Sequence, residues 1–462
     1  MPLVKDNTNS YVFMNRDTID FQKEPVTTLF RKLLIPTLLG SMAMSAVSTI
    51  DGIFVGHGVG ADGVAAVNIV VPIYQLIAGL GFMIGSGCSI VSTIHLSYQK
   101  QKVARINITQ ALVISTLFTV AIVVAVLLFP IETARLLGTS DTLQPLVLDY
   151  LKWIMPAFAF EIWMLIGLFI IRLDGSPRFA MWCNIVPALL NIILDWLFIF
   201  PLGMGVKGAA IATMASLVTG GLMAASYLLF FARSLRLIPL KISTKSLRLA
   251  WRNIGYQCKI GSSSLLGELT MAVFIYIGNW QFMRYLGDSG VGAFGIACYY
   301  TPFFFMIGNA IAQSAQPIIS YNYGIGHWQH IRETRRLLLR TALAFGGSLT
   351  LLFIFFPKSL VGLFVDTQSP AGEMASAGFP YLGTGIIFFI ANIAAIGYFQ
   401  SLERIKESTL FVLMRGFILL IPSFYLLPLV FGATGMWLAM PVTEILTSMV
   451  IYAMRQYRRE KR

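Results

Sequence analysis

Five acidic residues interrupt long apolar stretches of the chain, and their carboxylates are the groups best placed to do chemistry there. They are Asp51, Glu161, Asp195, Glu268 and Glu444. An ionised aspartate in the middle of a bilayer helix costs roughly 2.5 to 3.5 kcal/mol on insertion scales, so such groups usually face a cavity. A carboxylate in a cavity can accept a proton or hold a small hard cation. The pattern predicts ion binding, and we expect no enzymatic activity.

The composition explains why these acids lie in apolar surroundings. The 462 residues are 56% hydrophobic and 12% charged, whereas soluble domains average about 25% charged residues. The net charge of +13 would indicate a nucleic-acid partner in a soluble protein, but these basic residues fall mostly between apolar runs, as topology signals do. We therefore expect an integral membrane protein in contact with lipids and without a nucleic-acid partner.

Twelve apolar runs approach the roughly 20 residues that a membrane-spanning helix needs. They lie near 31–55, 64–86, 108–129, 143–171, 179–200, 206–231, 260–283, 291–321, 337–356, 378–400, 408–429 and 434–454. With an even number of spans, both termini lie on one side. The segments on that side hold 28 of the 34 Lys and Arg residues, against 4 in the opposite loops. This bias predicts that both termini are cytoplasmic.

The sequence repeats with an offset of 227 residues. This offset places Gly60 on Gly287, Gly63 on Gly290, Arg105 on Arg332 and Gly208 on Gly435. We expect an all-α fold of twelve transmembrane helices in two six-helix lobes related by pseudo-two-fold symmetry, an architecture suited to alternating access. The predicted divisions are a cytoplasmic tail at 1–28, an N-lobe at 29–232, a cytoplasmic linker at 233–258 and a C-lobe with a basic tail at 259–462.

A G-x-G-x-x-G pattern at Gly58, Gly60 and Gly63 admits two interpretations. A dinucleotide site needs a strand before the glycines, but here they lie between two apolar helices on the non-cytoplasmic side. A tight turn between the first two spans is the better interpretation. Because no G-x-x-x-x-G-K-[ST] loop occurs, we expect no nucleotide or other cofactor. The spacing of the four cysteines likewise predicts no disulfide framework or zinc site.

The predicted topology brings two of the acids to a similar depth. Asp51 and Asp195 both fall in the outer half of their spans, and Asn191 shares a helix face with Asp195. Tyr150 and Thr213, near the starts of inward-running spans, reach the same half. These five side chains could line one pocket that takes up a proton or binds Na⁺ through Asp51, Asn191, Asp195 and Thr213. The alternative is that the acids only satisfy neighbouring helices by hydrogen bonds.

Several motifs together resemble the multidrug and toxic compound extrusion (MATE) transporters. They are D-G-I-F-V-G from Asp51, R-L-D-G-S-P from Arg172, and N-I-I-L-D with G-V-x-G-A-A-x-A-T between Asn191 and Thr213. The resemblance, over about residues 25–455, implies an antiporter that exchanges H⁺ or Na⁺ for organic, often cationic or amphipathic, drugs and toxins and exports them across the bacterial inner membrane. It also implies ion coupling at the five residues above and a helix-bending role for Pro36.

The resemblance implies less about the second lobe and the substrate. Glu268 matches one acid of a further cation site found in some members, but Asn392 stands near the position of the second acid. This departure favours coupling in the N-lobe. Glu161 and Glu444 have no acidic repeat partner, and Glu444 can pair within its own lobe. We expect a functional monomer; the alternative function is a flippase for lipid-linked oligosaccharides, which would need a more basic cavity.

Overall fold

The computed structural model describes residue 21 and residues 24–240 and 243–460, and these residues are largely helical without any strand. Most of the expected N-terminal tail lies outside the described residues. The helices are α1 (Val26–Gly58), α2 (Ala61–Ser97), α3 (Gln101–Leu128), α4 (Pro130–Leu136), α5 (Gln144–Ile154), η1 (Met155–Ala157), α6 (Phe158–Leu173), α7 (Pro177–Ile199), α8 (Gly205–Ser226), η2 (Tyr227–Phe231), α9 (Thr244–Gly324), α10 (Trp328–Phe355), α11 (Pro357–Val361), α12 (Pro370–Ser401), α13 (Ile405–Leu413), η3 (Met414–Ile418), α14 (Leu420–Phe431) and α15 (Ala433–Glu460).

The long apolar helices agree with the predicted spans. Within the described residues, eleven helices are long and apolar enough to cross a membrane. One of these, α9, has 81 residues and is broken at Gly287, where φ is 63° and ψ is −156°. It therefore contains two spans, which brings the total to the twelve that were predicted. The fourth, sixth and eleventh spans each join an α-helix to a short 3₁₀ or π segment.

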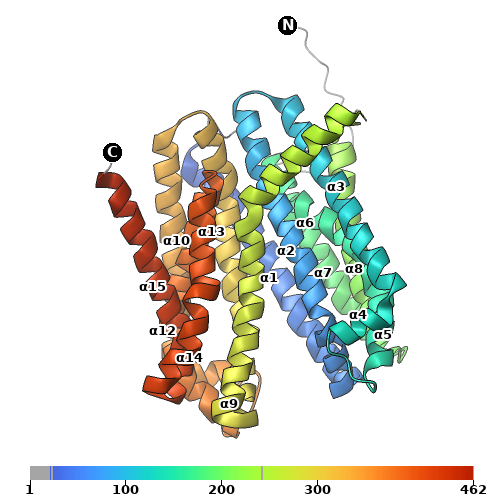
Figure 1. Cartoon of the computed structure of the whole chain (residues 1–462), viewed down its shortest axis with the longest axis vertical. Helices are drawn as coiled ribbons and strands as arrows, with labels where there is room; N and C mark the ends of the chain where they lie inside the picture. The colour runs from blue at the N-terminus through green and yellow to red at the C-terminus, as the bar shows by residue number, and fades with distance from the viewer. Residues whose placement is uncertain (1–20, 22–23, 241–242, 461–462) are drawn as a thin grey trace.

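The helices form two bundles, the N-lobe (α1 to η2) and the C-lobe (α9 to α15), which lie side by side in Figure 1. Each lobe has its own large cluster of buried apolar side chains. By contrast, apolar side chains such as Leu117 and Phe118 on α3 are 66% and 54% exposed. Apolar groups on the outer surface of a helical bundle are the expected contacts for lipid.

One segment crosses this division. The first turns of α1, including Leu29 and Leu33, are buried in the apolar cluster of the C-lobe, although the rest of α1 packs on α7 of the N-lobe. Pro36 follows directly after this part of the helix. The first span is thus held by both lobes, and Pro36 lies near the end of the part that contacts the C-lobe, since Leu38 also packs against that cluster.

The 227-residue repeat is visible in the backbone. Positive φ angles occur at Gly60 and Gly287, at Gly205 and Gly432, and at Gln99 and Gly326, and each pair is 227 residues apart. The short helices α4 and α11, which the sequence did not predict, also begin 227 residues apart, at Pro130 and Pro357. Gly60 lies between α1 and α2. The glycine motif is therefore a helix-to-helix turn, because its backbone needs the left-handed region that glycine readily adopts.

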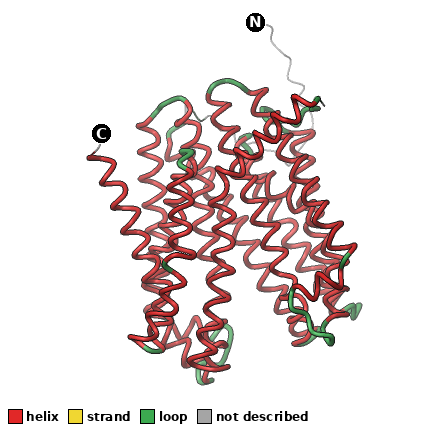
Figure 2. Tube along the Cα trace, in the orientation of Figure 1, coloured by secondary structure: helices red, strands yellow, loops and turns green. Residues whose placement is uncertain are grey.

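The hydrogen bonds between the two lobes lie in the half of the molecule where both chain termini are found. Gln316 donates to Ser89 over 3.0 Å, and since these residues are 227 apart, their contact marks the pseudo-two-fold axis. The Gln400 amide donates to Ser86 over 3.1 Å and to Ser264 over 3.0 Å. Figure 2 shows the two bundles standing apart at the opposite end. The described structure is therefore closed by polar contacts near the termini.

Close backbone packing accompanies these hydrogen bonds. A Cβ atom placed on Gly261 of α9 would overlap the carbonyl group of Met83 on α2, and one placed on Gly87 would overlap the carbonyl of Gln257. Only residues without a side chain permit α2 and α9 to approach this closely. The two glycines therefore keep the lobes in contact at the termini end.

We predict that Gly261→Leu separates the lobes at the termini end, because the new side chain cannot fit against the backbone of α2. In a variant lacking the four native cysteines, Gln316→Cys should then react several-fold faster with a charged maleimide. Gly255→Leu is the matched control, since Gly255 lies on the same helix, is exposed, and has open space where a Cβ atom would stand. Equal labelling rates in the two variants would contradict the assignment.

Candidate ion and substrate sites

Four N-lobe helices bring the five predicted side chains together. Asp51 lies on α1, Tyr150 on α5, Asn191 and Asp195 on α7, and Thr213 on α8. The carboxyl groups of Asp51 and Asp195 lie next to each other. The Asn191 amide donates to the Thr213 hydroxyl over 3.4 Å, and the Tyr150 hydroxyl lies beside Thr213. The helix spacing of α7 explains why Asn191 and Asp195 face the same neighbours.

The electrostatics of this cluster are unusual for a buried site. Asp195 is fully buried, and neither of its carboxyl oxygens accepts a hydrogen bond from a neighbouring N–H or O–H; the same is true of Asp51 Oδ1. Two adjacent buried carboxylates repel each other, which favours uptake of a proton by one of them. Buried charge must otherwise be compensated by a cation. The arrangement suits a proton or a small hard cation, for which Asn191 and Thr213 offer further oxygen ligands.

The other two predicted site residues lie elsewhere. Pro36 is buried within α1, 15 positions before Asp51. Glu268 is on α9 in the C-lobe, where it lines a cavity between the lobes. This cavity also receives Phe82 from α2 and Phe305 and Gln316 from α9. Its aromatic walls and single lining carboxylate are suited to an amphipathic cation.

Sequence reasoning missed one partner of Glu161. This acid on α6 is 1% exposed, and it lies beside Tyr74 of α2 and near Glu268 of the C-lobe. The acid was recognisable because it interrupts an apolar run. Tyr74 carries no comparable signal, since its role depends on how α2 packs against α6.

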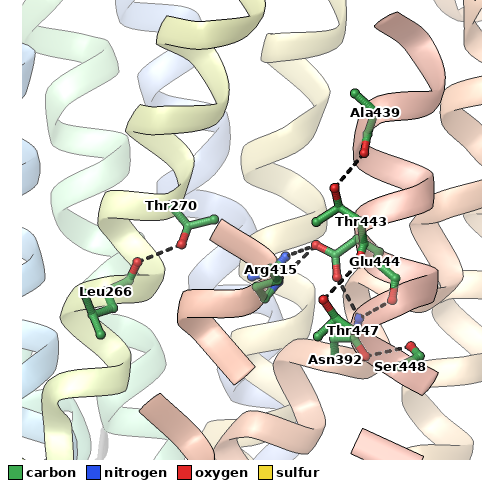
Figure 3. Close-up of polar contacts among 9 residues, drawn as sticks. All are labelled: Leu266, Thr270, Asn392, Arg415, Ala439, Thr443, Glu444, Thr447 and Ser448. Carbon is green, nitrogen blue, oxygen red and sulfur yellow. Dashed lines mark hydrogen bonds and ion pairs between the residues drawn. The ribbon is translucent and has the colours of Figure 1, made fainter. Parts of the chain in front are cut away.

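A second polar cluster occupies the C-lobe. Arg415 donates from Nε and Nη2 to Glu444 Oε1 over 3.0 and 2.7 Å. Asn392 donates to the other carboxylate oxygen of Glu444 over 2.7 Å. Figure 3 shows these three side chains converging from three different segments. Asn392 thus hydrogen-bonds with Glu444 rather than with Glu268, and Arg415 is the partner that sequence reasoning did not assign to Glu444.

We predict that Thr213→Val lowers the melting temperature more than Thr219→Val does. The Thr213 hydroxyl accepts a hydrogen bond from the Asn191 amide, so its loss leaves that buried donor unpaired, at a cost of about 1 to 3 kcal/mol. The Thr219 hydroxyl donates only to the Ala215 carbonyl of its own helix. Thermal unfolding of both purified variants in detergent tests this. Equal melting temperatures would show that the Thr213 contacts contribute nothing to stability.

Comparison with known proteins is consistent with this architecture. The family model named MatE matches the chain twice, over residues 36–197 and 264–426. The chain is 24% identical over 444 residues to the FAD transporter of Shewanella oneidensis, covering 94% of this chain and 95% of that protein. It is 22% identical over 446 residues to the multidrug export protein MepA of Staphylococcus aureus, with 94% and 95% covered.

Solved structures show the same fold. One, described as the outward-facing conformation of a multidrug resistance MATE family transporter, aligns with a TM-score of 0.87 at 20% identity and covers 95% of this chain and 97% of that one. The two matches of the family model fall one in each lobe, as the internal repeat requires. Members of this family are transporters rather than enzymes. The chain belongs to the MATE family of integral membrane transporters.

Proposed function

We propose that this transporter is a cation-coupled antiporter that exports organic cations in exchange for H⁺ or Na⁺. The observation that carries the proposal is the Asp51–Asp195 pair, in which both oxygens of Asp195 and one oxygen of Asp51 are buried without a donor from the surrounding helices. A site of this kind changes its net charge when an ion enters or leaves. An ion that binds one conformation more tightly than another shifts the population between them.

The first span offers a route from the ion site to the lobe interface. Its first turns pack in the C-lobe core, while Asp51 faces Asp195 in the N-lobe. Pro36, between these regions, cannot donate a backbone hydrogen bond and so makes bending of the helix easier. We infer that ion binding at Asp51 changes the bend at Pro36 and thereby the contact between the lobes.

The cavity between the lobes supports a substrate with a positive charge and an aromatic body. Glu268 is the carboxylate among the lining residues, and Phe82, Phe169 and Phe305 supply aromatic surface. The relatives differ in what their names state, multidrug export for one and FAD transport for another. Because Arg415, the cation in the lining, is already paired with Glu444, we infer a preference for organic cations over anions such as FAD.

The same pairing bears on the alternative function. A flippase for lipid-linked oligosaccharides would need free basic groups in its cavity to hold the pyrophosphate, and the described lining residues include one basic side chain, which is ion-paired. We further propose a functional monomer in the bacterial inner membrane with both termini in the cytoplasm. This orientation is supported by the excess of basic residues in the segments on the termini side.

We predict that Asp51→Asn and Asp195→Asn each abolish ion-driven export, because either change removes a charge from the pair. The measurement is efflux of a fluorescent organic cation from proteoliposomes under an imposed H⁺ gradient and, separately, an imposed Na⁺ gradient. Asp62→Asn is the matched control, since Asp62 is exposed in the first turn of α2 and should leave export unchanged.

Each outcome of this assay has a defined meaning. Wild-type efflux that ignores both gradients would reject the coupled antiporter. Wild-type rates in one of the two variants would remove that residue from the mechanism. Vesicles loaded with FAD or with a lipid-linked oligosaccharide should show no gradient-driven movement, and faster movement of either than of the organic cation would overturn the proposed substrate class.

A further inference from the structure

The two lobes compensate their buried acids in opposite ways. In the N-lobe, Asp195 accepts no hydrogen bond from a neighbouring N–H or O–H. In the C-lobe, both oxygens of Glu444 accept hydrogen bonds, Oε1 from Arg415 and Oε2 from Asn392. Glu444, Arg415 and Asn392 are each 2% exposed. The charge of the C-lobe acid is therefore neutralised by a side chain of the same chain.

Further contacts hold this C-lobe cluster in place. The Arg415 guanidinium lies 4.4 Å from the centroid of the Phe389 ring. Ser448 donates to Asn392 Oδ1 over 2.7 Å, and Asn392 also donates to the Glu444 backbone carbonyl over 2.8 Å. Figure 3 shows the guanidinium of Arg415 directed toward the carboxylate of Glu444. Since each polar partner is satisfied by another, a mobile cation has no free oxygen of Glu444 to bind.

The backbone around Arg415 is specialised for this position. Arg415 lies in the π segment η3, a rare local structure that often marks functional positions. A Cβ on the next residue, Gly416, would overlap Thr270 of α9. The missing side chain lets η3 pack directly on α9, with Arg415 at the edge of the cavity. The compensation of Glu444 by Arg415 is therefore built into the packing of η3 on α9.

The internal repeat shows that neither polar cluster has a copy in the other lobe. Adding 227 to the five N-lobe site positions gives side chains without a carboxylate, hydroxyl or amide: Gly278, Ala377, Ile418, Pro422 and Met440. Subtracting 227 from Asn392, Arg415 and Glu444 gives Leu165, Ala188 and Leu217. The backbone is duplicated, whereas the chemistry of the two lobes is not.

We propose that Arg415 is the resident counter-cation of the C-lobe: its guanidinium stands where a mobile ion would otherwise neutralise Glu444, so all coupling ions bind in the N-lobe. This inference rests on the proposed antiport function. Glu268 is then left as the cavity carboxylate that meets the substrate. Glu444 then adds nothing to the number of ions exchanged per substrate.

The test is the number of cations exchanged per substrate molecule. In proteoliposomes, ion gradients are imposed at known membrane potentials, and the substrate gradient at which net substrate movement stops is measured. The number of ions per substrate follows from this balance. The double variant Arg415→Gln/Glu444→Gln removes both charges while retaining hydrogen-bonding amides, and it should exchange the same number of ions as the wild type. Arg415→Gln alone should exchange one ion more, because Glu444 must then be neutralised by a mobile cation.

The control is Lys152→Gln, which removes a basic group from an exposed position on α5 and should leave the ion number unchanged.

A double variant that exchanges one ion fewer than the wild type would overturn the proposal, because Glu444 would then be an ion site in the native protein. An unchanged number in a folded Arg415→Gln variant would also overturn it. If the single variant does not fold, the double variant decides. Absence of any ion-driven exchange in the wild type would instead reject the proposed function together with this inference.

Discussion

A buried charge in a membrane protein must be compensated, and most of the specific structure of this transporter depends on how that is done. Water cannot solvate an ionised side chain between the helices, so a partner must come from the protein or from a mobile ion. In the C-lobe, Arg415 and Asn392 satisfy Glu444 within the chain. In the N-lobe, the oxygens of Asp195 have no such donors. The first arrangement is suited to a fixed structure and the second to ion exchange.

The two lobes differ in how they compensate buried acids, although their backbones are duplicated. Gly60 and Gly287 adopt positive φ at equivalent turns, and α4 and α11 begin at equivalent prolines. Such features constrain how the chain reverses direction at the membrane surface, and both halves need them. The polar side chains differ between the lobes because their proposed roles differ. One lobe is proposed to exchange ions, and the other is proposed to provide a stable surface for the substrate cavity.

The interface between the lobes links these two parts. The glycines that allow α2 and α9 to touch, together with the Ser89–Gln316 contact on the pseudo-two-fold axis, close the molecule near the termini. The first turns of α1 pack in the C-lobe core, while Asp51 of the same helix belongs to the proposed N-lobe ion site. A change of charge at Asp51 therefore acts on a helix that already contacts both lobes, and no separate connecting element is required.

The sequence by itself determined the membrane class, the twelve spans and the duplication, because hydrophobic length, basic loops and a constant offset are properties of the linear chain. It also grouped Asp51 with Tyr150, Asn191, Asp195 and Thr213, since helix direction and depth can be counted in residues. The tertiary structure alone decided the partners. That Arg415 neutralises Glu444, that Asn392 contacts Glu444 instead of Glu268, and that Tyr74 lies beside Glu161 follow from which helix faces meet. No local pattern encodes that choice, because side chains far apart in sequence become neighbours only when the helices pack.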